Sequence, residues 1–248
     1  MAAGNTVHAD GPNDPLPMNL RTADLPRRLG SALAMLAVAA LAVGIGGRVL
    51  DAFIVLVALV AFAEFALLVL RATRNWLVRL LGLAAGAAYF GFAAAILTGA
   101  GTFLLLMVVG ITVFTDTGAY FTGRAIGGPK IAPRISPSKT WAGLAGGMAA
   151  SVAWVFLWVW AMESELGWPR FELGLNLSPQ NLTGAVALGA GLAVVAQVGD
   201  FFESWLKRKA GVKDSSRLIP GHGGVFDRVD GLIPVALAAG VFAVQMAP

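Results

Sequence analysis

The sequence predicts an all-α polytopic membrane protein, and three observations support that prediction. Hydrophobic residues make up 57% of the 248-residue chain and charged residues only 13%, whereas charged residues are roughly 25% of a soluble globular domain. Apolar runs recur at the length that a bilayer-spanning helix needs, about 20 residues. Lysine and arginine gather between alternate runs, as expected where positive charge is retained on one side of a membrane.

We expect about seven transmembrane helices, each an apolar run bounded by charged or turn-forming residues. The first run, SALAMLAVAALAVGIGG, has no ionisable group, and the fourth is short and ends in polar residues. The runs lie at residues 29–47, 52–70, 80–98, 100–116, 142–161, 184–205 and 230–247. The stretch 1–28 is polar and rich in Pro, Asn and Asp, so we expect a disordered cytoplasmic tail there.

The distribution of positive charge predicts the orientation of the helices. If the amino terminus is cytoplasmic, all of the 18 lysines and arginines except Arg48 and Arg170 lie on the cytoplasmic side. The net charge of +4 is not expected to serve nucleic-acid binding, because no soluble domain is available to carry a broad basic patch. The absence of cysteine excludes disulfides and thiolate metal sites.

Two cytoplasmic segments, 116–141 and 200–230, hold most of the ionisable residues outside the tail. Because charge beside membrane helices is costly, this concentration indicates a site. In the stretch DFFESWLKR, which continues the sixth run, the polar side chains fall on one helical face at 100° per residue. That face contains Asp200, Glu203, Ser204 and Lys207. A carboxylate at the membrane end of such a stripe, here Asp200, needs a partner.

The next stretch, KDSSRLIPGHGGVFDRVDG, combines basic residues, glycines and paired acids. Its glycines leave the backbone free to approach an anion. Asp227 and Asp230 stand three apart at the predicted start of the seventh helix, which places both on one face near a positive helix end. Carboxylates placed this way suit Mg²⁺, which binds one or two protein carboxylates plus phosphate oxygens and water. The other candidate ligand-binding residues here are Lys213, Asp214, Arg217, His222, Gly223, Gly224 and Arg228.

The earlier segment contains FTDTGAYFTGR, where Asp116 lies on a polar helical face, and then GGPKIAPRISPSKTW. Prolines 129, 133 and 137 forbid a continuous helix, so we expect a constrained loop that leads into the fifth helix. Ser138 is the expected cap of that helix, with Lys139 placed to bind a phosphate. The role of Glu64, alone inside the second apolar run, stays open between an ion pair and a place in the site.

Taken together, these motifs resemble the signature of the phosphatidate cytidylyltransferase family, also called CDP-diacylglycerol synthases. The run begins Ser204-x-Leu206-Lys207-Arg208 and continues through Lys213-Asp214 and PGHGG to Asp227-Arg228-x-Asp230. DTGAYFTGR and SPSKTW also match, and the hydrophobic layout suits the family over roughly residues 25–248. Ser138 departs from the pattern, because the family usually has a second lysine before Lys139.

The resemblance implies transfer of a cytidylyl group from CTP to phosphatidic acid, giving CDP-diacylglycerol and pyrophosphate. It implies Mg²⁺ held by the acids that match Asp200 and Asp227, and it allows a second ion, K⁺, in the same centre. It further implies a homodimer among the membrane lipids of the cell inner membrane. Residues 29–248 would then form one transmembrane catalytic domain with a polar cleft and active site facing the cytoplasm.

The expected roles follow from phosphate chemistry. The lipid phosphate is already anionic, so positioning and charge neutralisation matter more than a general base. We expect catalytic roles for Asp200, Asp227, Lys207 and Asp230. We expect substrate binding by Ser204, Lys139, Arg208, Lys213, Asp214, Arg217, His222, Gly223, Gly224, Arg228 and Asp116.

Two rival functions differ in what they require. A transporter would carry acids near the midplane of several helices, whereas only Glu64 occupies such a place clearly. A CTP-using enzyme that acts on another lipid, such as a polyprenol kinase or an archaeol-type cytidylyltransferase, shares the need for a nucleotide site, and the signature disfavours the kinase. A CDP-alcohol phosphotransferase is less favoured, because its DG-x2-AR spacing is absent.

Overall fold

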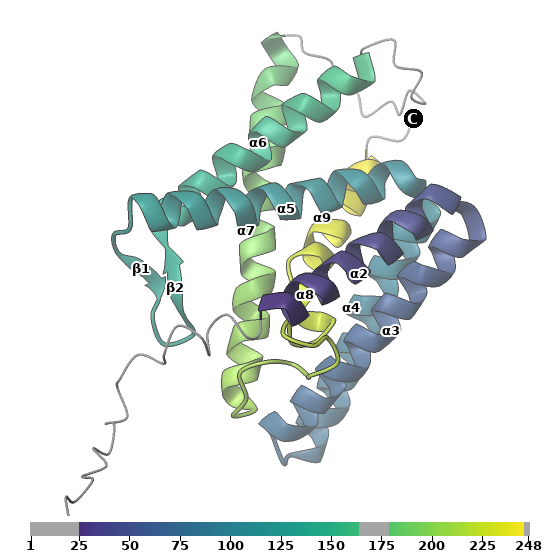
Figure 1. The fold of residues 1–248 in the computed structure, drawn as a ribbon, viewed down its shortest axis with the longest axis vertical. Coiled ribbons are helices and arrows are strands. Elements are labelled where there is room, and N and C mark those ends of the chain that lie inside the picture. Colours follow the sequence, from purple (N-terminus) through teal and green to yellow (C-terminus); the bar gives the residue numbers. More distant parts are fainter. Residues whose placement is uncertain (1–24, 164–178, 246–248) are drawn as a thin grey trace, which may run out of the picture.

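The computed structural model describes residues 25–163 and 179–245, which form a helical bundle with one small hairpin (Figure 1). In chain order the elements are α2 (Leu25–Ile45), α3 (Gly47–Ala72), α4 (Trp76–Gly99), α5 (Gly101–Ala125), β1 (Lys130–Ala132), β2 (Ser136–Thr140), α6 (Trp141–Glu163), α7 (Pro179–Lys209), α8 (Phe226–Val229) and α9 (Leu232–Gln245). The all-α polytopic prediction is confirmed, since β1 and β2 are the only strands in the described part of the chain.

Six helices in the described ranges, α2 to α7, are long and apolar enough to cross a membrane. The seventh predicted span, 230–247, corresponds to α9, whose described apolar stretch Leu232–Phe242 is shorter than a full crossing. The chain turns at 230–231, between α8 and α9, so the helix begins two residues later than predicted, at Leu232. Residues 1–24 of the predicted tail, 1–28, lie outside the described residues. The last four residues of the predicted tail, 25–28, are helical, because α2 begins at Leu25.

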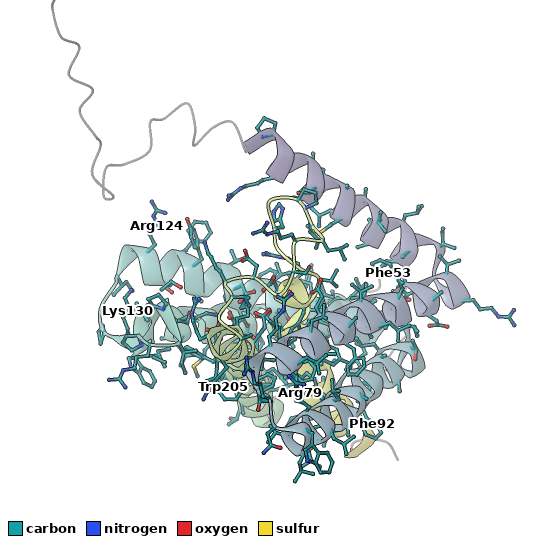
Figure 2. The ribbon with its side chains drawn as sticks, turned by 90° about the horizontal axis from the view of Figure 1, so that it is seen from below. Phe53, Arg79, Phe92, Arg124, Lys130 and Trp205 are labelled. Atoms are coloured by element: carbon teal, nitrogen blue, oxygen red, sulfur yellow. The ribbon has the colours of Figure 1, made fainter. Side chains whose placement is uncertain are left out.

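The long helices expose apolar side chains around the outside of the bundle, as a lipid-facing surface requires. Leu36, Leu59 and Phe92 are each about 60% exposed or more. Figure 2 shows Phe92 on the outside of the bundle and α2, in purple, running along its edge. Water would penalise so much exposed apolar surface, whereas hydrocarbon does not. The chain is therefore an integral membrane protein.

Helices α5 and α6 pack closely because small residues face bulky ones across their interface. A side chain at Gly110 would overlap the ring of Trp154, and one at Gly146 would overlap Thr122. The Trp154 indole donates a hydrogen bond to the Met107 carbonyl at 3.1 Å. This packing holds the C-terminal half of α5, which contains Asp116, against α6, and the hairpin lies beside the same end of α5 (Figure 1).

An aromatic cluster fixes α8 against α3 and α4. The Phe226 ring lies 6.0 Å from Phe65 of α3 and 5.4 Å from Phe90 of α4. Phe226 is 1% exposed, and burial of a phenylalanine contributes about 1.5 to 3 kcal/mol. Because Phe226 directly precedes Asp227, this cluster sets where that carboxylate can lie.

The β1–β2 hairpin corrects one prediction about the segment before α6. Its strands pair antiparallel, with Lys130 opposite Thr140. Ser138 lies within β2 and does not cap a helix. The cap is Thr140, whose Oγ1 accepts a hydrogen bond from the Gly143 amide at 3.0 Å. Pro137 can lie in β2 because each strand of a two-stranded sheet has one unpaired edge, where the N–H that proline lacks is not needed.

Candidate active site

The polar stripe predicted on α7 is present. Ser204 Oγ donates to Asp200 Oδ1 at 3.5 Å, and Lys207 Nζ donates to Glu203 Oε2 at 2.7 Å. Both pairs are spaced four residues apart, the separation that brings side chains together on a helix. Asp200 also pairs with Lys139 of β2, whose ammonium reaches Gln197 Oε1 at 3.0 Å. Lys139, predicted to bind phosphate, is therefore engaged with α7.

Asp227 is held by a lysine and by the loop that joins α7 to α8, residues 210–225. Lys207 Nζ donates to Asp227 Oδ1 at 2.7 Å. The Gly224 and Ser215 amides donate to Oδ2 at 2.7 and 2.9 Å, and the Ser215 hydroxyl oxygen lies 2.9 Å from the same atom. Burial alone would raise the pKa of Asp227, but the hydrogen bonds that Lys207 and the Gly224 amide donate to it hold this pKa well below its usual range.

Asp230 lies in a more negative environment. Burial, and then the negative charge of Asp200, raise the pKa of Asp230 to about 7, with a smaller contribution from Asp116. Its Oδ1 accepts the Gly231 amide at 2.9 Å. Asp116, Asp200 and Asp230, from α5, α7 and the α8–α9 junction, are thus electrostatic neighbours. A cation bound near them would reduce the repulsion between their negative charges.

The carboxylates suit a hard divalent cation in their chemistry. Glu203 is 1% exposed, and its Oε1 is buried without a hydrogen-bond partner. In the described residues, however, no group of three or more His, Asp or Glu side chains is arranged so that it could hold a metal ion. Mg²⁺ needs only one or two protein carboxylates when phosphates and water complete its shell. Asp200 and Asp227 have the carboxylate chemistry of such a site, and in this structure they are paired with Lys139 and Lys207, respectively.

A cationic pocket of about 410 Å³ lies next to Asp227, within the 210–225 loop and against the first turn of α2. Figure 2 shows the yellow loop next to the start of purple α2. Six residues predicted to bind substrate line the pocket, together with Arg28, Ser216, Ile219, Pro220 and Gly221. The six are Lys213, Asp214, Arg217, His222, Gly223 and Arg228.

Backbone geometry shapes the floor of this pocket. The Ile219 amide donates to the Gly223 carbonyl at 2.8 Å, and the His222 amide returns to the Ile219 carbonyl at 3.0 Å. Gly223 has φ +84, a conformation that side chains disfavour. The Arg228 guanidinium donates to the His222 carbonyl at 2.6 Å. The loop backbone thus holds the Arg228 guanidinium in place.

The structure adds Arg28, which the sequence reasoning did not assign to the site, and separates Arg208 from it. The Arg28 stem lies against Gly221, and Ser31 Oγ lies 2.9 Å from both His222 Nδ1 and the Pro220 carbonyl. Arg208 is exposed near the end of α7 and does not line the pocket. The position of Arg28 next to the first apolar run was the available signal in the sequence. The neighbouring residues do not distinguish Arg28 from the basic residues that flank membrane helices on the cytoplasmic side.

The fold and the site define a helical membrane protein in which basic side chains and a group of carboxylates converge from α2, α5, α7 and the α7–α9 segment. The sequence pattern of the cytidylyltransferase family matches residues 70–245, well over half of the chain. The chain belongs to this family.

Relatives named phosphatidate cytidylyltransferase share substantial sequence with the chain. The Brucella suis protein is 45% identical over 159 residues, which cover 62% of this chain and 53% of the relative. The Haemophilus influenzae protein is 42% identical over 132 residues, or 53% of this chain and 42% of the relative. The Thermotoga maritima protein is 38% identical over 131 residues, or 53% and 45%. The chain thus spans about half the length of the curated relatives it matches.

Proposed function

We propose that this protein transfers the cytidylyl group of CTP to phosphatidic acid and releases pyrophosphate. The observation that carries the proposal is the juxtaposition of a pocket rich in cations with Asp227, whose carboxylate lies against the pocket residue Gly223 and binds Lys207 near the end of α7. The pocket suits a polyphosphate, because four basic side chains, Arg28, Lys213, Arg217 and Arg228, line it. The family and the names of the relatives supply cytidylyl transfer and phosphatidate as the chemistry.

The reaction needs one bond made and one broken. An oxygen of the lipid phosphate attacks the α-phosphorus of CTP, and the bond from that phosphorus to the bridging β-phosphate oxygen breaks. Pyrophosphate leaves with the electron pair. The nucleophile is already ionised, so no side chain has to remove a proton from it. The pocket cations bind and orient the phosphates, and Lys207 holds Asp227 in place.

Asp200 and Asp227 would hold a divalent cation, Mg²⁺, with Asp230 next to them and K⁺ as a second ion. When bound, the cation supplies charge neutralisation for the phosphate oxygens. Lys139 and Ser204 orient Asp200 through the ion pair and the 3.5 Å hydrogen bond. Asp116 contributes negative charge from α5.

We also propose that the protein is a homodimer of the cell inner membrane with its active site on the cytoplasmic side. The positive-inside distribution of lysine and arginine supports this side. A cytoplasmic site gives soluble CTP direct access while the lipid stays in the inner leaflet. Cross-linking in native membranes and labelling of the pocket residues from either side test the two statements.

One assay tests the activity. Purified protein in detergent, given labelled CTP, Mg²⁺ and phosphatidic acid, should form a lipid-soluble cytidine product, and chelation of Mg²⁺ should abolish the product. The same mixture with diacylglycerol or a polyprenol tests a kinase. Loss of label from CTP without a cytidine lipid, or no reaction with any lipid, would contradict the proposal. Ion flux in proteoliposomes without lipid product would favour a transporter.

Replacing Arg28 with alanine should raise the KM for CTP about tenfold, because a hydrogen bond to a charged group contributes about 1.5 kcal/mol at the lower end. Turnover at saturating CTP should change little, since Arg28 lies on the pocket wall, where it contacts the loop at Gly221. Steady-state kinetics at several CTP concentrations measure both parameters. Arg48→Ala is the matched control, because Arg48 is also exposed near a helix start but does not line the pocket. An unchanged KM in Arg28→Ala would remove α2 from the binding site.

A further inference from the structure

Glu64 is a buried carboxylate on α3 whose role the sequence left open. It is 4% exposed and lies in the middle of an apolar helix. Both of its oxygens face the segment that surrounds Asp227. It precedes residues 70–245, the part that matches the family pattern. A buried ionisable group inside a membrane helix requires partners, and the identity of those partners indicates its function.

Four donors from that segment converge on Glu64. Ser216 Oγ and the Val225 amide donate to Oε1 at 2.6 and 3.1 Å. Ser215 Oγ and the Phe226 amide donate to Oε2 at 2.9 and 2.7 Å. Each carboxylate oxygen thus accepts one hydroxyl and one backbone amide. A carboxylate is the side chain that can accept all four, because it has no donor of its own when ionised.

The close approach of Glu64 also explains why position 224 is glycine. A side chain there would overlap both Ser215 Oγ and Glu64 Oε2. Those two groups are buried and engaged in hydrogen bonds, so neither has free space to move into. Gly224 therefore lets the carboxylate reach both ends of the 210–225 loop, and its own amide remains directed at Asp227 Oδ2.

The two carboxylates are linked through one serine. The Ser215 hydroxyl lies 2.9 Å from both Glu64 Oε2 and Asp227 Oδ2, while its amide also donates to Asp227. Phe226, held by Glu64 through its amide, directly precedes Asp227. We propose that Glu64 is a positioning residue that fixes the 210–225 loop and thereby orients Asp227 for the reaction.

The alternative is that Glu64 contributes only to general packing of α3. The positioning role and the packing role predict that a Glu64 variant loosens different parts of the protein. A positioning role predicts that loss of Glu64 loosens 213–226 selectively, whereas a packing role predicts a uniform loss of stability. Amide hydrogen exchange resolves this difference, because it measures opening segment by segment. It needs no substrate, so its outcome is independent of the proposed activity, on which only the turnover measurement rests.

Glu64→Gln is the informative variant, because it keeps the shape and replaces one acceptor oxygen by an NH₂ group that faces existing donors. We expect exchange of the amides in 213–226 to become at least about tenfold faster, with the rest of the bundle unchanged. Turnover should fall at least about tenfold, because Asp227 loses its fixed orientation. Asp51→Asn is the matched control. It removes one charge from the same helix about 20 Å from Glu64 at 1.5 Å per residue.

Leu68→Ala controls for destabilisation of α3, since Leu68 is fully buried one turn from Glu64. It should lower thermal stability while exchange in 213–226 relative to the rest of the bundle, and turnover per folded molecule, stay near wild type. Ser216→Ala should speed exchange of the loop in the wild-type and Leu68→Ala backgrounds. In the Glu64→Gln background the effect of Ser216→Ala should be much smaller, because the carboxylate that accepts the Ser216 hydrogen bond has already been altered.

The proposal is overturned if Glu64→Gln leaves exchange of 213–226 at the wild-type rate, or if Ser216→Ala is fully additive with it. It is also overturned if Leu68→Ala loosens this segment as much as Glu64→Gln does. Wild-type protein that shows no cytidylyl transfer, with loop exchange that still depends on Glu64, would refute the activity and retain the positioning role.

Discussion

Asp227→Asn should lower turnover at saturating Mg²⁺ at least a hundredfold, which corresponds to about 2.7 kcal/mol of lost transition-state stabilisation. Asparagine fills the same space but removes the negative charge. If its oxygen keeps the donors from Gly224 and Ser215, its NH₂ group faces the Lys207 ammonium, which is also a donor. The variant therefore loses the proposed cation ligand and repels the lysine that holds it.

Steady-state turnover of the purified protein in detergent tests this prediction, and thermal unfolding shows whether the variant is folded. Asp227→Glu serves as the second variant, because it retains the charge and displaces it by one methylene. We expect it to recover part of the activity at raised Mg²⁺ concentration, whereas Asp227→Asn should not respond. Near-normal turnover in Asp227→Asn would place the reaction elsewhere.

The sequence was sufficient where the interactions are local. The stripe of Asp200, Glu203, Ser204 and Lys207 follows from the spacing of residues on one helix, and the observed pairs are four residues apart. The apolar runs likewise predict the six long helices, because bilayer thickness fixes their length. These features need no knowledge of how the helices meet.

The partners that organise the site are not local, and the sequence alone did not identify them. Glu64 reaches Ser215 across 151 residues, and Ser31 reaches His222 across 191. Neither Glu64 nor Ser31 carries a motif that names its partner. The cap at Thr140 was missed for a different reason. Ser138 is a good capping residue by type, but pairing of β1 with β2 delays the start of α6 to Trp141.

The α8–α9 junction shows how burial overrides a hydrophobic pattern. Residues 230–247 read as one apolar run, yet Phe226 inserts among Phe65 and Phe90, and Glu64 binds the amides at the start of α8. These contacts give α8 its own orientation, so the chain turns before Leu232. The turn leaves Asp227 facing Lys207 and puts Asp230 within reach of the charge of Asp200.

Lys207→Met should both destabilise the protein and inactivate it. Lys207 Nζ lies 2.7 Å from Glu203 Oε2 and 2.7 Å from Asp227 Oδ1, and the two acidic side chains are 1% and 7% exposed. Removing the cation leaves two buried carboxylates without their counter-charge. Breaking a buried ion pair on one side costs about 3 to 5 kcal/mol. We expect this loss in thermal unfolding, and turnover at least a hundredfold below wild type, which is about 2.7 kcal/mol.

The double variant Lys207→Met/Glu203→Gln separates the two effects. It removes one of the stranded charges, so much of the lost stability should return. Turnover should stay low, because Asp227 still lacks the ammonium that fixes its Oδ1. Lys207→Arg keeps the charge, but the guanidinium is wider and planar and does not place one nitrogen 2.7 Å from both carboxylates as the ammonium does. We therefore expect intermediate activity. If the double variant recovered turnover along with stability, Lys207 would serve only to balance the charge of Glu203, and the proposed role in holding Asp227 would be wrong.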